Sequence, residues 1–169
     1  MTLVIRDARP ADTDTIVGIL IASNEASFPH LLDEHGRDHA FWTDRWRRYL
    51  TQGSAAQFSL GDGFALLAEL EGRAVGFAGY HHTTRHGTDA ELESIYVLED
   101  AQGGGIGSRL LGIVASRLLA GGSRTMCVGY HPKNPYKRFY VKHGAVEINP
   151  HWAVWNDLAP VAELAAPPS

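Results

Sequence analysis

The chain has 169 residues, which is enough to bury one hydrophobic core and too few for two full domains. Its composition is 44% hydrophobic and 20% charged, as in folded globular proteins, and its net charge of −4 argues against a nucleic-acid-binding surface. No apolar run is long enough to span a membrane, and the single cysteine, Cys127, excludes an internal disulfide. Because the N-terminal segment also lacks the apolar core of a signal peptide, we expect a cytoplasmic location.

The first half of the chain predicts strands around two helices. Residues 2–8 alternate apolar and polar side chains as a strand does, and Pro10 then marks the start of a helix. A second helix with an aromatic face is expected around residues 41–50, followed by a polar connection. Residues 64–70 and 73–80 predict two strands joined by a tight turn at Glu71 and Gly72.

The second half alternates strands and helices, which gives an α+β order overall. A strand over residues 90–97 leads into a glycine-rich turn and a helix that Gly121 and Gly122 end. The remaining predicted elements are a strand at 125–129, a helix at 135–142 that ends at Gly144, and strands at 146–148 and 152–158. We therefore expect a single domain over residues 1–158 and a flexible tail, rich in alanine and proline, over residues 159–169.

The glycine-rich turn is the most informative feature of the sequence. Its glycines are Gly103, Gly104, Gly105 and Gly107, and an amphipathic helix starts within the turn. Exposed backbone N–H groups at the positive end of a helix dipole bind anions, and glycine lets a phosphate approach the backbone closely. The lysine of a P-loop is absent after Gly107, and the third glycine of a dinucleotide fingerprint is also absent.

Gln102-x-x-Gly105-x-Gly107, directly after a strand that ends at Val97, resembles the acyl-CoA-binding motif of the GNAT superfamily of N-acetyltransferases. Asn134, Phe139, Tyr140 and Gly144 resemble the second half of that family's cofactor region, so the resemblance covers roughly residues 90–148. It implies a three-layer α/β/α fold with a mixed, mostly antiparallel sheet. In that fold two central parallel strands splay apart, and the pantetheine arm of the cofactor lies between them.

The resemblance implies an enzyme that transfers the acetyl group of acetyl-CoA, its cosubstrate, to a primary amine by direct attack in a ternary complex. The alternative is a non-catalytic acyl-CoA-binding domain with a sensing or structural role. The expected acceptor is a small-molecule or peptide amine, with no nucleic acid or membrane as partner, and homodimers are common among resembling proteins. The expected cofactor-binding residues are Tyr96, Val97, Gln102, Gly103, Gly104, Gly105, Ile106, Gly107, Ser108 and Asn134.

Two of these residues carry specific expectations. The backbone N–H near Val97 is expected to polarise the thioester carbonyl. Asn134 lies one residue closer to Phe139 and Tyr140 than the family pattern has it, so it either binds the pantetheine amides or caps the following helix.

The resemblance also supplies candidates for proton transfer. Glu91 lies where several family members have a catalytic glutamate, so it is ranked first as the base and Glu93 second, with a water chain as the alternative to both. These glutamates are two residues apart on one strand and should share a face. Tyr140 is the expected general acid for the leaving thiolate. The alternative is that Tyr140 only packs its helix onto the sheet.

Two further sets of residues complete the expectations. The histidines lack any spacing typical of zinc sites, so no metal is expected. The first two helices shape the acceptor side in the resembling fold, and their aromatic residues should mostly pack in the core, with one or two lining the amine pocket. These residues are Phe28, Phe41, Trp42, Trp46 and Tyr49.

Overall fold

The computed structural model describes residues 1–27, 29–32 and 34–167, so Phe28 lies outside the described residues. Its strands form one sheet in the order β1-β2-β3-β4-β5-β7-β6. The strands are β1 Leu3–Asp7, β2 Ser59–Leu70, β3 Arg73–Thr83, β4 Ala90–Val97, β5 Met126–Gly129, β6 Val146–Asn149 and β7 Trp152–Trp155. The helices are α1 Thr13–Ser27, α2 His39–Gln52, α3 Ile106–Ala120, α4 Lys137–Lys142 and α5 Ala159–Ala162, with short 3-10 turns η1 Pro10–Asp12, η2 Pro29–Leu31, η3 Arg85–Gly87, η4 Glu99–Ala101 and η5 Glu163–Ala165.

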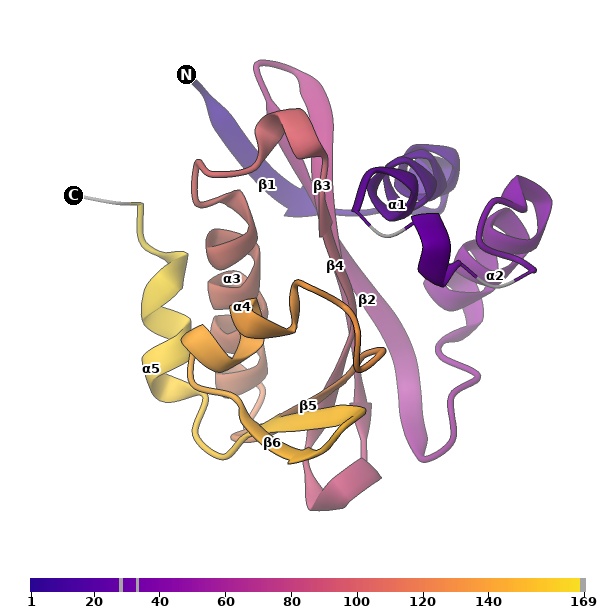
Figure 1. Ribbon diagram of the computed structural model, residues 1–169. Coiled ribbons are helices and arrows are strands. Elements are labelled where there is room, and N and C mark those ends of the chain that lie inside the picture. The colour runs from indigo at the N-terminus through magenta and orange to yellow at the C-terminus, as the bar shows by residue number, and fades with distance from the viewer. Residues whose placement is uncertain (28, 33, 168–169) are drawn as a thin grey trace.

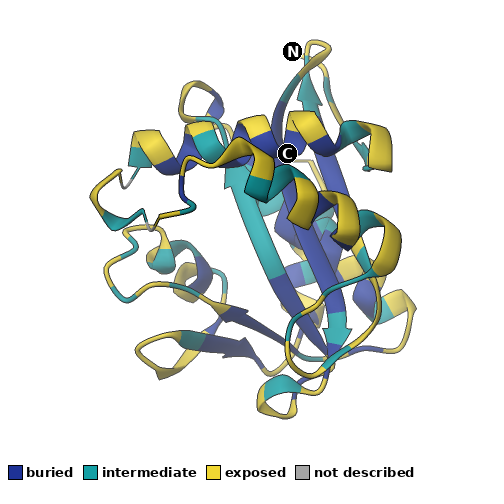
Figure 2. Cartoon of the chain, turned by 90° about the vertical axis from the view of Figure 1, so that its right-hand side faces the viewer, coloured by how far each residue is buried: buried dark blue, intermediate teal, exposed yellow. Residues whose placement is uncertain are grey.

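Helices cover both faces of the sheet, which gives the three layers expected from the sequence (Figure 1). On one face, α1 and α2 bury Ile16, Leu20 and Trp46 against Leu67 and Phe77 of the sheet. On the other face, α3 and α5 enclose a second core that includes buried leucines of α3 and of the central strands. The central strands are accordingly buried along much of their length while the outer helix faces are exposed (Figure 2).

The tight turn between β2 and β3 forms where the sequence predicts it. Glu71 and Gly72 both have positive φ angles, 51° and 77°, which two-residue hairpin turns of the common primed type require. Strand β2 begins earlier than predicted, at Ser59, because a register shift between Leu60 and Gly63 accommodates the polar residues there.

The parallel pair at the centre of the sheet is short. Strands β4 and β5 pair over Ala90–Leu92 and Met126–Val128 and then separate, although β4 continues to Val97. The other neighbouring strands pair antiparallel. The mixed sheet with splayed central parallel strands is therefore confirmed.

The C-terminal segment differs from the expected flexible tail. Residues 159–165 form α5 and η5 and pack along α3. Gly112 of α3 allows this contact, because a Cβ atom there would lie 2.2 Å from the backbone nitrogen of Ala165. Buried Leu158 and Val161 anchor the segment to the same core, so apolar residues outweigh the alanine- and proline-rich composition in deciding its structure.

Candidate functional site

The glycine-rich turn presents backbone N–H groups at the start of α3. Gly103 and Gly105 have φ angles of 85° and 81°, and Gly105 is the N-cap of α3 without any side-chain cap. The N–H of Arg109 donates to the carbonyl oxygen of Gly105 at 3.0 Å. The N–H groups of the preceding first turn have no partner within the helix. A Cβ atom at Gly103, Gly104 or Gly105 would meet nothing within 4 Å, so the turn is open to a ligand.

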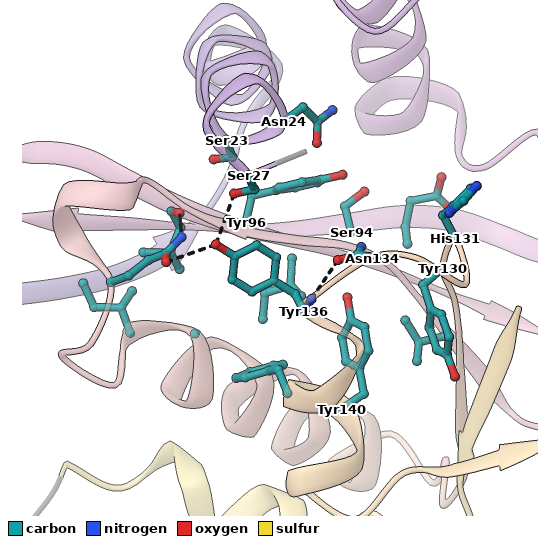
Figure 3. A pocket seen from close by; sticks show the side chains of 18 of the residues that line it. Ser23, Asn24, Ser27, Ser94, Tyr96, Tyr130, His131, Asn134, Tyr136 and Tyr140 are labelled. Carbon is teal, nitrogen blue, oxygen red and sulfur yellow. Dashed lines mark hydrogen bonds between the residues drawn. The ribbon is translucent and has the colours of Figure 1, made fainter. Parts of the chain in front are cut away.

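A pocket of about 630 Å3 runs from this turn into the gap between the separated strands. Strand β4 contributes Glu93 to Val97, and β5 with its following loop contributes Val128 to His131. Helix α1 and the loop before α4 line the same pocket, so residues far apart in the sequence meet there (Figure 3). The separation of β4 and β5 thus creates a pocket between the two strands that extends to the glycine-rich turn.

The end of β4 offers a backbone donor to this gap. The N–H of Leu98 donates to the carbonyl oxygen of Val75 on β3, at 2.8 Å. Because successive N–H groups along a strand point to opposite edges, the N–H of Val97 points away from β3 and toward the gap. The side-chain amide of Gln102 donates to the carbonyl oxygen of Val97 at 3.0 Å, so it holds the strand end in place.

Tyr140 lies in the pocket with its hydroxyl pointing inward from α4 (Figure 3). Its ring stacks on Tyr130, with centroids 5.9 Å apart, and only 8% of the residue is exposed. Burial, with smaller effects of Tyr96 and Tyr130, raises the pKa of Tyr140 above its usual value. The hydroxyl is therefore protonated at neutral pH and available as a hydrogen-bond donor. Burial also raises the pKa of neighbouring Tyr96, to about 12.

The two candidate bases occupy different environments. Glu93 lines the pocket, with 16% of its side chain exposed and Arg45 at 3.6 Å. Glu91 does not line the pocket and accepts a hydrogen bond from His81 Nε2 at 2.9 Å. The pairing of β3 with β4 shifts register between Leu92 and Ser94, which leaves Glu93 as the unpaired residue of a bulge. Both glutamates are on the α2 side of the sheet, as expected, but only Glu93 reaches the pocket.

Other predicted binding residues have partners within the protein. Asn134 Oδ1 accepts from the N–H of Tyr136 at 2.8 Å, which stabilises the turn before α4. The Ser108 hydroxyl is 2.9 Å from His143 Nε2, and burial lowers the pKa of His143. The Asn134 side chain therefore serves the turn in this structure and also lines the pocket, so its contact with a cofactor stays a prediction.

The sequence identified the acceptor side of the pocket only in part, through the aromatic residues of the first two helices. Trp42 lines the pocket, as expected for one or two of the aromatic residues, while Trp46 and Tyr49 are buried in the core. Other lining residues that the sequence did not single out are Ser23, Asn24, Ser27, Tyr130, His131 and Tyr136. The Tyr136 hydroxyl lies within hydrogen-bond distance of both Ser27 and Gln102, so it links α1 to the glycine-rich turn (Figure 3).

One cluster has the residue types of a metal site. The ligand atoms of His81, Glu91 and Glu93 all lie within 4.8 Å of one another. However, the imidazole bridges the glutamates, with Nε2 at 2.9 Å from Glu91 and Nδ1 at 3.6 Å from Glu93. Arg85 also lies 3.6 Å from Glu91, where its guanidinium already supplies positive charge. The three side chains thus contact one another and Arg85, and the expectation of no metal stays a prediction.

One comparison with known proteins identifies a family for this chain. The sequence profile of the acetyltransferase (GNAT) family matches residues 14–145. No curated protein shows significant sequence similarity to the chain. Among the described residues, no helix is long and apolar enough to cross a membrane.

Solved structures share the fold. The PaiA N-acetyltransferase from Thermoplasma acidophilum in complex with coenzyme A has 17% identity and a TM-score of 0.70, over 91% of this chain and 98% of that one. A GNAT family acetyltransferase from Brucella melitensis in complex with acetyl-CoA has 21% identity and a TM-score of 0.61, over 91% of this chain and 87% of that one. An aminoglycoside 6'-acetyltransferase of type Ii has 19% identity and a TM-score of 0.64, over 93% of this chain and 98% of that one.

Proposed function

Since the chain belongs to the acetyltransferase (GNAT) family, we propose that it transfers the acetyl group of acetyl-CoA to a primary amine by direct attack in a ternary complex. The observation that carries the proposal is that one pocket is lined both by the glycine-rich turn and by a glutamate, Glu93, together with aromatic side chains such as Tyr140. Similar structures were solved with coenzyme A and with acetyl-CoA, which supports the choice of acyl donor.

The residues at the glycine-rich turn fit the diphosphate of coenzyme A. The first-turn N–H groups of α3 are free of helical partners, and the glycines leave open space in front of them. The gap between β4 and β5 then receives the pantetheine arm, whose amides can bond to the strand edges that the splay leaves unpaired.

The residues around the middle of the pocket perform the chemistry. The N–H of Val97 donates to the thioester carbonyl oxygen and stabilises the negative charge that develops there, by on the order of 3 kcal/mol. The amine nitrogen forms a bond to the carbonyl carbon, and the carbon–sulfur bond breaks. Tyr140 donates its proton to the leaving sulfur, which its burial and raised pKa support.

Glu93 is the better candidate for the base, because its carboxylate lines the pocket and Glu91 does not. It removes a proton from the substrate ammonium so that a neutral amine can attack. As the amide forms, the nitrogen loses a second proton, which replaces the one that Tyr140 gave to the thiol. The proton that Glu93 took is released to water, so each turnover of a protonated amine yields one free proton.

The test is thiol release from acetyl-CoA with a panel of primary amines, followed by mass analysis of the products. We expect release with at least one amine and a product heavier by one acetyl group. Tight binding of coenzyme A without release for any amine would instead support a non-catalytic sensor. Failure to bind coenzyme A in calorimetry and in thermal-shift measurements would overturn both readings.

A further inference from the structure

His81 is the fully buried member of a cluster of polar groups that reaches the pocket through Glu93. None of its surface is exposed, and it extends from β3 between the two glutamates of β4. Its Nε2 is 2.9 Å from Glu91 Oε2, and its Nδ1 is 3.3 Å from the Tyr49 hydroxyl. A buried imidazole with both nitrogens engaged has a fixed ring orientation.

The neighbouring tyrosine indicates which nitrogen carries the proton. Burial raises the pKa of Tyr49, and the nearby Glu93 and Glu91 raise it further. The Tyr49 hydroxyl therefore keeps its proton and donates it in a hydrogen bond to Nδ1. A carboxylate only accepts, so Nε2 carries a proton and donates it to Glu91. The lone pair of Nδ1 accepts from the Tyr49 hydroxyl at 3.3 Å, and Glu93 lies 3.6 Å from the same nitrogen.

We propose that His81 acts through Glu93 as a second proton acceptor, which takes the proton that Glu93 removes from the substrate ammonium and holds it beside Glu91. This inference rests on the proposed acetyl transfer. Glu93 receives a proton from the ammonium. Once the Tyr49 hydroxyl turns away from Nδ1 of His81, Glu93 passes the proton to that nitrogen, which regenerates the Glu93 carboxylate. Nε2 keeps its own proton on Glu91, whose negative charge stabilises the imidazolium in the way a buried carboxylate stabilises the histidine of a catalytic triad. After acetyl transfer the held proton returns through Glu93 to water, so no proton is gained or lost in the cluster.

The groups around His81 are consistent with this role. Arg85 from η3 lies 3.6 Å from Glu91, and Arg45 from α2 lies 3.6 Å from Glu93, so each carboxylate has one nearby cation. Cys127 from β5 packs on the same side, and burial raises the pKa of its thiol to about 11, so it stays neutral. The imidazole is therefore the one group between the carboxylates, among those described here, that can accept a proton from Glu93.

The test compares His81→Gln, Glu91→Gln and the double variant with the wild type. At neutral pH each single substitution should lower kcat roughly 10- to 100-fold, within the range of acid–base contributions, while affinity for coenzyme A is unchanged. The loss of kcat should become smaller as the pH rises, because an amine that is already deprotonated needs no proton acceptor. The double variant should lose little more than the worse single variant, because both residues serve the same step.

His82→Gln is the matched control, since His82 is the next residue of β3, points to the opposite face and contacts Ser123. It should keep the wild-type rate. The proposed proton transfer from Glu93 to His81 is called the relay below. A loss of kcat in His81→Gln that is independent of pH, or losses of kcat that multiply in the double variant, would overturn it. If His81→Gln fails to fold in thermal unfolding, Glu91→Gln alone decides by the same pH criterion, because glutamine keeps the shape of glutamate.

Two outcomes separate this inference from its alternatives. Activity that falls with a chelator and returns with zinc would overturn the relay in favour of a metal held by His81, Glu91 and Glu93. A wild-type protein that releases no thiol with any amine would overturn the proposed function and the relay with it. An active wild type together with an unimpaired His81→Gln variant would overturn the relay alone.

Discussion

Substitution of Gly104 by alanine should weaken binding of coenzyme A without destabilising the fold. Gly104 has no positive φ angle, and a Cβ atom there meets nothing within 4 Å, so the free energy of unfolding should change by less than about 0.5 kcal/mol. If the diphosphate binds to this turn as proposed, the added methyl group keeps it from approaching the backbone. Loss of one hydrogen bond to a charged group costs roughly 1.5–3 kcal/mol, which corresponds to a dissociation constant roughly 10- to 100-fold higher.

Gly122→Ala is the matched control at the other end of α3. Gly122 has a φ of 93° and also faces open space. Alanine there should lower the free energy of unfolding by about 1–2 kcal/mol, because only the left-handed backbone conformation disfavours it. For a chain of this length that lowers Tm by roughly 2–8 °C, with no change in coenzyme A affinity. Calorimetric titration with coenzyme A and thermal unfolding of both variants make the comparison. Wild-type affinity in Gly104→Ala would refute the placement of the diphosphate on this turn.

The remaining predictions concern the acid, the C-terminal segment and acid stability. Tyr140→Phe should lower kcat by roughly 100-fold with unchanged coenzyme A affinity, and an unchanged rate would remove Tyr140 from the mechanism. Gly112→Val should displace η5 and expose the C-terminal segment to proteolysis, whereas Gly18→Ala, with open space around it, should leave stability equal or raise it by up to about 1 kcal/mol. A hydrogen bond from Arg6, aided by the N–H of Arg9, holds the pKa of Asp12 below its usual value, so its contribution to stability is present above about pH 4 and is lost as the pH falls through the folded pKa. Asp12→Asn should therefore lower Tm at neutral pH, and the difference from wild type should disappear in acid; a constant difference would contradict this assignment.

The sequence predicted the elements whose patterns are local. Strand β4 and the glycine turn were identified because an apolar run, a cluster of glycines and an amphipathic helix follow one another within about 30 residues of chain. The hairpin at Glu71 and Gly72 was identified for the same reason. The resemblance then supplied the splay of β4 and β5, which no local pattern encodes.

The sequence could not distinguish the environments of Glu91 and Glu93. Their spacing places both on one face, but the bulge at Glu93 depends on the pairing of β4 with β3, and the burial of Glu91 depends on His81 and Arg85 from other segments. The helical C-terminal segment was missed because its stability comes from burial of Leu158 and Val161 in the core and from close contact with Gly112, rather than from its own helix propensity.

The brevity of the parallel pairing has a mechanical consequence. Three residue pairs join β4 to β5, so the half of the sheet that carries β1 to β4 meets the half with β5 to β7 along a narrow seam. In the proposed complex, the pantetheine amides of the acyl donor would lie between β4 and β5, where the two strands no longer pair, and would act as an additional strand. On this proposal the two halves of the sheet would be joined most firmly when the cosubstrate is bound.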